Sequence, residues 1–358
     1  MDVQGPASIG ESLLNQLALS PDAYVQNVDF ARQIALVVVL DARTYRGASF
    51  LDDRVLAPGM KGAWLPFGRV MEASLHVGSK RPRHFIFHTG HVGSTLLTRL
   101  LEDVADLLSL REPLPLRALA QMHDALGQAD SLLSRSEFDN ALGIFMRLWS
   151  RGYSSTQAVI VKATSTAGRI AVPVLDADAS SRAIYMNLRA EPYLATLLAG
   201  QNSPIDLRGH GPERMRRLQS RSAEAMPPLS GLSLGQLAAM SWLCETCTQR
   251  EAVERFPDRV MALDFEGFLA GLGSAMGRVL AHFALPSDDR IVSAIEHSAS
   301  LMRYSKAPEY DYSPAIRSEV LREARREHRE EIRKGMAWLE DRARSDALLA
   351  RIVNGAGL

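Results

Sequence analysis

The fold of this chain is decided by the stretch His84-Phe85-Ile86-Phe87-His88-Thr89-Gly90-His91-Val92-Gly93-Ser94-Thr95-Leu96-Leu97. Its apolar start predicts a buried strand, its glycines permit a tight turn, and the leucines after the turn recur on one helical face. A turn between a strand and a helix directs free N–H groups and the positive end of the helix dipole at one point, which phosphate commonly occupies. The stretch therefore predicts an anion-binding loop made of Gly90, His91, Val92, Gly93, Ser94 and Thr95.

This loop differs from the phosphate-binding loop of nucleotide kinases. That loop carries a lysine directly before its Ser or Thr, whereas Gly93 precedes Ser94 here. Without the lysine the loop is poorly equipped to bind a β,γ-phosphate with magnesium. Its backbone N–H groups and hydroxyls can still hold a 5′-phosphate. An ordinary tight turn is the alternative interpretation.

The composition is that of an ordinary globular protein. Of 358 residues, 46% are hydrophobic, and 41 basic residues balance 41 acidic ones. The balance gives no reason to expect nucleic acid or a membrane surface as a partner. Residues 1–6 lack the features of a signal peptide, and the two cysteines, Cys244 and Cys247, are too few for a disulfide framework, so a cytoplasmic protein is expected. The cysteines are interpreted as core residues rather than metal ligands.

Two regions are expected. Residues 1–80, with a strand at 33–40 and a short helix, predict a small N-terminal α+β lobe of unassigned role. In residues 81–358, strands at 84–88, 107–110, 158–162, 182–188 and 259–263 alternate with helical segments. This alternation predicts an α/β fold with a parallel central sheet flanked by helices. Residues 201–232 are expected to be a long loop or lid with one short helix near Pro212–Ser220. Residues 315–350 are expected to form a long C-terminal helix whose Glu and Arg side chains face solvent.

Functional groups follow four of the predicted strands. The loop follows the first strand, Glu112 the second and Arg189 the fourth, and Lys162 ends the third. Because ligands bind outside the carboxyl ends of parallel strands, these groups are expected to converge at one edge. Such a set suits transfer of a group from an anionic donor to a hydroxyl. Arg189 would bind a second phosphate, Lys162 would neutralise the leaving oxygen and Glu112 would accept the proton. Alone, each would be an ordinary solvated or ion-paired charge.

The chain resembles the sulfotransferase family, which uses 3′-phosphoadenosine 5′-phosphosulfate (PAPS). In that family a basic residue, Ser, Gly, Ser or Thr, and Thr precede a helix, and the run from His91 to Leu97 matches the glycine, both hydroxyls and the leucines. Leu110-Arg111-Glu112-Pro113 resembles the region of bacterial members that holds a glutamate base. Residues 185–192 resemble the strand whose final arginine binds the 3′-phosphate, and residues 263–268 resemble a later acidic motif. The resemblance covers roughly residues 84–310.

The resemblance implies a bacterial enzyme of P-loop nucleotide-kinase-like architecture that moves a sulfuryl group from PAPS to a hydroxyl or amine of a small-molecule or peptide acceptor, without a metal. The implied catalytic residues are Glu112, Lys162 and His91. The loop from Gly90 to Thr95 would bind PAPS together with Arg189, Thr196 and Lys306.

The chain departs from the family at three places. The basic residue of the loop is His91, so its charge would depend on pH. Leu197 stands where a serine is usual, with Thr196 beside it, and the C-terminal Gly-x-x-Gly-x-Trp-Lys motif is absent. The segment Tyr304-Ser305-Lys306 is a candidate substitute for its phosphate contacts.

Two other functions stay open: a small-molecule kinase of related loop architecture, and a nucleotide-binding protein without turnover. The departures at His91 and Leu197 are the best support for the second. His84 and His88 share a strand face and suggest a metal site with His91, although polar groups at a sheet edge explain them better. Neither the acceptor nor the oligomeric state can be derived from the sequence.

Overall fold

The computed structural model describes residues 6–78, 80–222, 224–307 and 309–355. At its centre lies a five-stranded sheet with the order β5-β6-β4-β7-β8, made of β4 (Arg83–His88), β5 (Leu107–Arg111), β6 (Ala158–Lys162), β7 (Ala183–Asn187) and β8 (Val260–Asp264). Every pairing in it is parallel; for example, Ile86 pairs with Lys162 of β6 and with Ile184 of β7. The predicted α/β fold with a parallel central sheet is confirmed.

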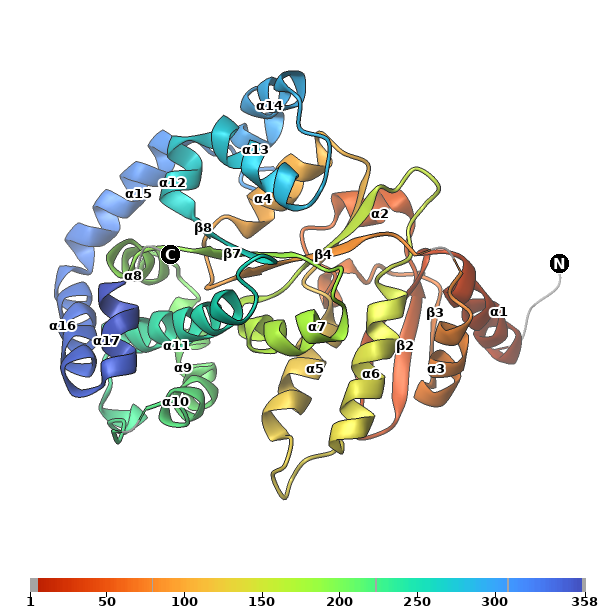
Figure 1. The fold of residues 1–358 in the computed structure, drawn as a ribbon, viewed down its shortest axis with the longest axis horizontal. Helices are drawn as coiled ribbons and strands as arrows, with labels where there is room; N and C mark the ends of the chain where they lie inside the picture. The colour runs from red at the N-terminus through yellow and green to blue at the C-terminus, as the bar shows by residue number, and fades with distance from the viewer. Residues whose placement is uncertain (1–5, 79, 223, 308, 356–358) are drawn as a thin grey trace.

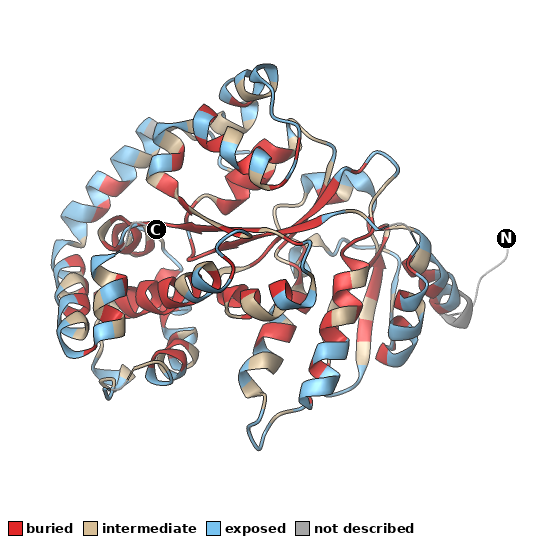
Figure 2. Cartoon of the chain, viewed as in Figure 1, coloured by how far each residue is buried: buried red, intermediate tan, exposed pale blue. Residues whose placement is uncertain are grey.

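Helices cover both faces of this sheet (Figure 1). On one face lie α4 (Ser94–Glu102), α12 (Phe265–Ala270) and α13 (Leu272–His282), and on the other lie α5 (Leu114–Ala125), α6 (Arg135–Leu148) and α7 (Ala171–Ala177). The central strands are buried along their length (Figure 2). Side chains of β4 alternate between two cores, because Phe85 and Phe87 pack with α5–α7 whereas Ile86 packs with α4 and α13.

The N-terminal region shares the first of these cores. It contains α1 (Pro6–Leu19), β1 (Ala23–Asp29), β2 (Ile34–Val39), α2 (Ala42–Gly47), β3 (Gly62–Pro66) and α3 (Phe67–Leu75). The strands form an antiparallel sheet in chain order, and β2 is the strand predicted at 33–40. The buried Arg151 guanidinium donates to the carbonyl oxygens of Leu17, Ser20 and Ala23, which ties this region to the end of α6.

The segment 201–232 is more helical than predicted. Besides α8 (Ala190–Leu198) before it, the structure has α9 (Ser203–Gly209), α10 (Gly211–Gln219) and the 3-10 turn η3 (Leu229–Gly231). The short helix predicted near residues 212–220 is α10, but α9 was missed. Pro204 lies in the first turn of α9, where proline needs no N–H donor. Buried Leu207 and Leu218 attach the two helices to the core. The long helix α11 (Leu234–Arg255) follows.

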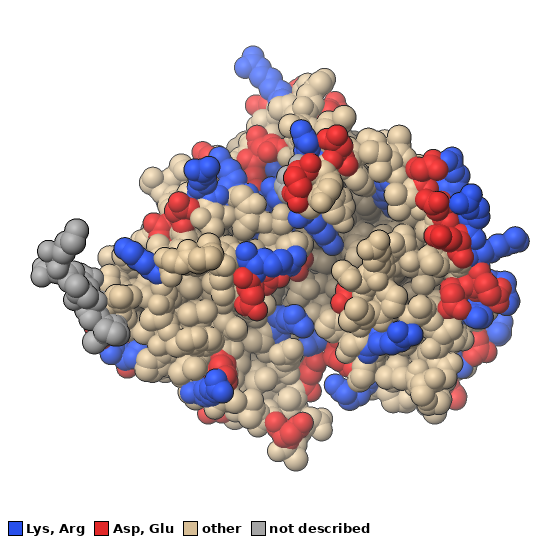
Figure 3. Space-filling view, turned by 180° about the vertical axis from the view of Figure 1, so that it is seen from behind, with Lys and Arg blue, Asp and Glu red and all other residues tan. Residues whose placement is uncertain are grey.

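The prediction of one long C-terminal helix was also wrong. After α14 (Asp289–Glu296), residues 314–354 form three helices, α15 (Pro314–Glu327), α16 (Arg329–Ser345) and α17 (Ala347–Asn354). The chain breaks at His328 and at Asp346, whose carboxylate accepts from the N–H groups of Leu348 and Leu349 and so begins a new helix. Acidic and basic side chains are interleaved over the surface seen in Figure 3. None of the helices in the described ranges is both long and apolar enough to cross a membrane.

Candidate functional site

The loop between β4 and α4 has an unusual backbone. Gly90, His91 and Gly93 all have positive φ, at 106°, 55° and 71°. Position 93 accepts no side chain, because a Cβ there would lie 2.1 Å from Cε2 of Phe265. Positive φ strains a residue with a side chain such as His91, and such strain is concentrated at functional sites. The sequence therefore needs Gly93 both for the backbone conformation and for the close approach of the Phe265 ring.

Hydrogen-bond donors at the start of α4 are available to a ligand. The first N–H groups of any helix have no partner within it, and Gly93 caps α4 without a side-chain hydrogen bond. The Thr95 side chain is 1% exposed, and its Oγ1 has no hydrogen-bond partner among the described residues. By contrast, Thr98 Oγ1 one turn later donates to Ser94 O at 2.7 Å. An anion in the loop would satisfy the Thr95 hydroxyl together with the N–H groups.

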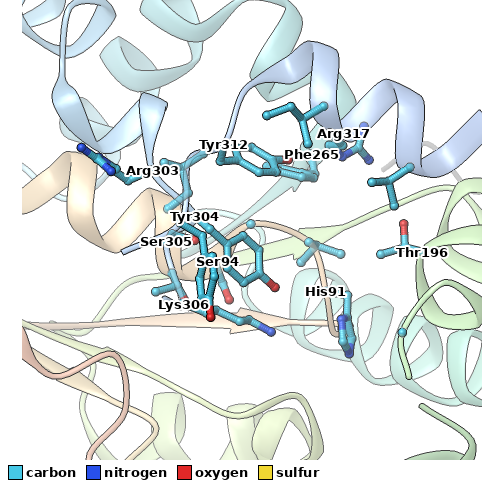
Figure 4. A pocket seen from close by; sticks show the side chains of 18 of the residues that line it. His91, Ser94, Thr196, Phe265, Arg303, Tyr304, Ser305, Lys306, Tyr312 and Arg317 are labelled. Atoms are coloured by element: carbon cyan, nitrogen blue, oxygen red, sulfur yellow. The ribbon is translucent and has the colours of Figure 1, made fainter. Parts of the chain in front are cut away.

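The loop opens on a cavity of about 440 Å³ (Figure 4). One wall is formed by loop residues and by the ends of neighbouring elements of the sheet. The other wall comes from the C-terminal part of the chain. The cavity brings together these predicted site residues: His91, Val92, Gly93, Ser94, Thr95, Glu112, Thr196 and Lys306. Gly90 lies at the base of the loop, where a Cβ would be 3.5 Å from the Tyr193 hydroxyl oxygen.

Glu112 and Lys162 form an ion pair beside the loop. The Lys162 ammonium donates to Glu112 Oε1 and is fully buried, whereas 19% of the Glu112 side chain is exposed. Burial lowers the pKa of Lys162, and the Glu112 carboxylate opposes that shift. Glu112 also has a positive φ of 56°. Arg111, the other cation considered as its partner, pairs instead with Glu102. An ionised carboxylate held at a cavity wall can accept a proton.

Lys306 reaches the same place from a hairpin-like segment. Tyr304 N–H donates to Tyr310 O at 2.8 Å, and Tyr312 N–H donates to Met302 O at 3.0 Å, so residues 302–312 fold back on themselves. Arg99 of α4 donates to Ser305 O at 2.9 Å and attaches this segment to the loop helix. Burial lowers the pKa of Lys306, and the nearby Glu112 carboxylate opposes the shift. Lys306 and Glu112 therefore line the same cavity.

The three histidines of the motif lie in different surroundings. His91 opens on the cavity, where the surrounding protein, with Lys306 and Arg214, lowers its pKa to about 4. The imidazole is therefore neutral near pH 7 in the free protein and gains a proton only at acid pH. His88 contacts Ala163 O through Nε2 at 2.8 Å, and burial lowers its pKa well below the usual value. His84 stacks on Phe283. In the described part of the chain, no three potential ligands gather as a metal site.

Arg189 is a predicted site residue that lines a different cavity. Its side chain is exposed and lines a different cavity of about 510 Å³, together with Glu191 and Arg325. Those two residues form an ion pair with a shortest distance of 2.8 Å. Arg189 follows its strand as predicted and is the N-terminal cap of α8, but it lines this second cavity and not the loop cavity.

Sequence reasoning missed most of the C-terminal wall. The cavity is also lined by Arg303, Tyr310, Tyr312, Ile316, Arg317, Val320 and Leu321. Arg317 among these belongs to the segment 315–350, which was interpreted as a solvated helix face. One feature of the sequence could have identified Arg317. It lies one helical turn after Ser313, the N-terminal cap of α15, and so belongs to the start of that helix.

No protein-family model and no curated protein matches the chain. Among solved structures, the chain is similar to a sulfotransferase domain from the curacin biosynthetic pathway, with a TM-score of 0.40 and 14% identity over 66% of this chain and 85% of that one. It is also similar to a sulfotransferase from Alicyclobacillus acidocaldarius, with a TM-score of 0.39 and 15% identity over 74% and 96% of the two chains. A sulfotransferase from Mycobacterium avium matches with a TM-score of 0.37 and 11% identity, over 88% and 95%. These scores are too low to carry the functional assignment, which depends on the cavity.

Proposed function

We propose that this protein is a sulfotransferase that moves a sulfuryl group from PAPS to a hydroxyl or amine of a small-molecule or peptide acceptor in the cytoplasm. The observation that carries the proposal is the buried Thr95 hydroxyl, which has no hydrogen-bond partner among the described residues. It lies at a helix start in the same cavity as the Glu112 carboxylate. The resemblance of residues 91–97 to the donor-binding loop of sulfotransferases supports the same ligand. No feature of the cavity favours a kinase.

The donor end of the reaction belongs to the loop. The N–H groups at the start of α4 and the hydroxyls of Ser94 and Thr95 bind the 5′-phosphosulfate. The neutral His91 ring lies at the rim and forms a hydrogen bond to the same group. The Lys162 ammonium pairs with the Glu112 carboxylate, and Lys306 lines the same cavity. Both place positive charge near the point where the leaving oxygen gains negative charge.

The acceptor end belongs to Glu112. The acceptor oxygen or nitrogen attacks sulfur in line with the bond to the 5′-phosphate, and Glu112 takes its proton. The new bond to sulfur forms as the bond from sulfur to the phosphate oxygen breaks, and that oxygen leaves with the electron pair on 3′-phosphoadenosine 5′-phosphate. Lys162 holds the Glu112 carboxylate in place through their ion pair.

Ligand-dependent melting tests the donor assignment. A ligand that binds only the native state raises the melting temperature, so millimolar 3′-phosphoadenosine 5′-phosphate should stabilise the protein clearly more than ATP with magnesium. Release of the bisphosphate from PAPS in the presence of simple phenols and amines then measures transfer. An unchanged melting curve with the bisphosphate, or a larger shift with ATP and magnesium, would overturn the proposal.

A further inference from the structure

The cavity has a second cation that sequence reasoning did not assign. Arg317 belongs to the first turns of α15 and reaches the cavity wall, whereas Lys306 reaches it from the 302–312 segment; the two side chains lie apart in Figure 4. Thr196 of α8 lines the same wall. The loop and Arg317 therefore present separate positively polarised sites to one ligand volume.

The Arg317 guanidinium is poorly satisfied by the protein itself. Its Nη1 lies 3.7 Å from Glu266 Oε1, which is an ion pair too long for a hydrogen bond. Its Nη2 is buried and has no hydrogen-bond partner among the described residues. The guanidinium lies over the Phe265 ring, 5.2 Å from the centroid, and only 16% of the side chain is exposed. An unpaired buried donor on a cation is costly, and an anionic ligand group would remove that cost.

The arginine expected from the family motif is in the wrong place for this ligand. Arg189 is exposed and lines the separate cavity with Glu191 and Arg325. Phe265, in contrast, connects Arg317 to the loop, because its ring approaches Gly93 and also lies under the guanidinium.

We propose that Arg317, and not Arg189, binds the second anionic group of the nucleotide, the 3′-phosphate of the donor. This inference rests on the proposed function. A planar guanidinium suits a phosphate because it offers two parallel N–H donors. Arg317 is thus a specificity-determining residue: it distinguishes a nucleotide with phosphates at both the 5′ and 3′ positions from one with a 5′-phosphate alone.

Calorimetric titration with two probes tests this directly. Adenosine 3′,5′-bisphosphate and adenosine 5′-monophosphate are titrated into wild type, Arg317→Gln and the matched control Arg189→Gln. Wild type should bind the bisphosphate roughly 10–100-fold more tightly, as expected of a hydrogen bond to a charged group. Arg317→Gln should reduce that ratio to a few-fold and leave the affinity for the monophosphate near wild type. Arg189→Gln should keep the wild-type ratio.

A second variant at the same position keeps the test informative if Arg317→Gln does not fold. Arg317→Lys keeps a cation on α15 but removes the planar fork, so it should retain only part of the preference for the bisphosphate. A preference that survives in Arg317→Gln and disappears in Arg189→Gln would overturn the inference. Equal binding of both nucleotides by wild type would also overturn it while leaving the loop assignment intact. Absence of binding of either nucleotide to wild type would overturn the donor assignment itself and the inference with it.

Discussion

The two walls of the cavity are built in different ways. The sheet wall consists of the loop after β4 and the residue after β5, and its groups are buried, strained or paired at short range. The C-terminal wall consists of the residues between 303 and 321 that line the cavity. Among them Arg303, Tyr304 and Tyr310 are exposed, and none has positive φ. A site held on a rigid sheet fixes atoms for chemistry, whereas a wall on surface segments can vary without loss of the core. The difference suggests that the first wall carries out the reaction and the second selects the donor.

The largest expected effect is on turnover, at the sheet wall. Replacing Glu112 by glutamine removes the proton acceptor and should lower turnover by at least ~10²-fold, with little change in affinity for 3′-phosphoadenosine 5′-phosphate. Rates of transfer to a phenol measure the first effect and titration measures the second. If Glu112→Gln keeps most of its turnover, Glu112 is not the base.

The same substitution should also lower stability, because Lys162 is fully buried and loses its counter-charge. Breaking a buried ion pair costs roughly 3–5 kcal/mol. The double variant Glu112→Gln/Lys162→Met removes the unpaired ammonium, so it should recover melting temperature but not turnover. Glu191→Gln, which breaks the exposed pair with Arg325, is the matched control and should change neither by much.

The second largest effect is expected when the backbone conformation of the sheet wall is disturbed at Gly93. Gly93→Ala combines a positive φ with a clash against Phe265, so it should destabilise the protein by ~2–4 kcal/mol and abolish stabilisation by the bisphosphate. Gly127→Ala has a similar φ of 80° but no atom within 4 Å of the added Cβ. It should show only the cost of strain, ~1 kcal/mol, with normal ligand binding. Equal melting curves for the two variants would contradict a role for Phe265.

The sheet wall could be predicted from sequence because its information is local. Strand ends, glycines and hydroxyls within 84–97 place the loop, and parallel pairing places Glu112 beside it. The direction of Arg189 could not be predicted, because the rule for strand ends gives an edge of the sheet and not the side on which a following helix carries a side chain. Arg317 lies in a run with the spacing of a solvated helix, and its burial depends on packing of α15 against α8 and α12. The lowered pKa of His91 could not be predicted either, because it depends partly on Lys306 and Arg214, which are distant in sequence.

A third effect concerns the unsatisfied hydroxyl of the sheet wall. Thr95→Ala removes a donor to the phosphate, so affinity for the bisphosphate should fall roughly tenfold. Because Thr95 Oγ1 has no partner among the described residues, the free protein should not become less stable. Thr98→Ala is the control: it loses the bond to Ser94 O, so it should lower stability slightly and leave affinity nearly unchanged. Melting curves with and without ligand separate the two patterns.

The smallest expected effect is the pH dependence contributed by His91, at the rim where the two walls meet. In the free protein its pKa is lowered from 6.5 to about 4, so the unfolded chain binds the proton first as pH falls. The free protein therefore loses part of its stability between about pH 6.5 and pH 4. A bound phosphate favours the imidazolium and raises this pKa. Affinity for the bisphosphate should consequently rise a few-fold as pH falls through the pKa of the complex.

The comparison of wild type with His91→Gln isolates this effect. The phosphates of the ligand gain protons near pH 6, but that change is common to both proteins and disappears from the ratio of their affinities. The ratio should favour wild type increasingly between pH 8 and pH 5, and the stability of the ligand-free variant should fall less steeply toward acid pH. A ratio that stays constant with pH would show that the His91 ring does not contact the phosphate. The anion site would then consist of the backbone and hydroxyl groups of the sheet wall with Lys306, and the loop would bind its ligand without a titrating side chain.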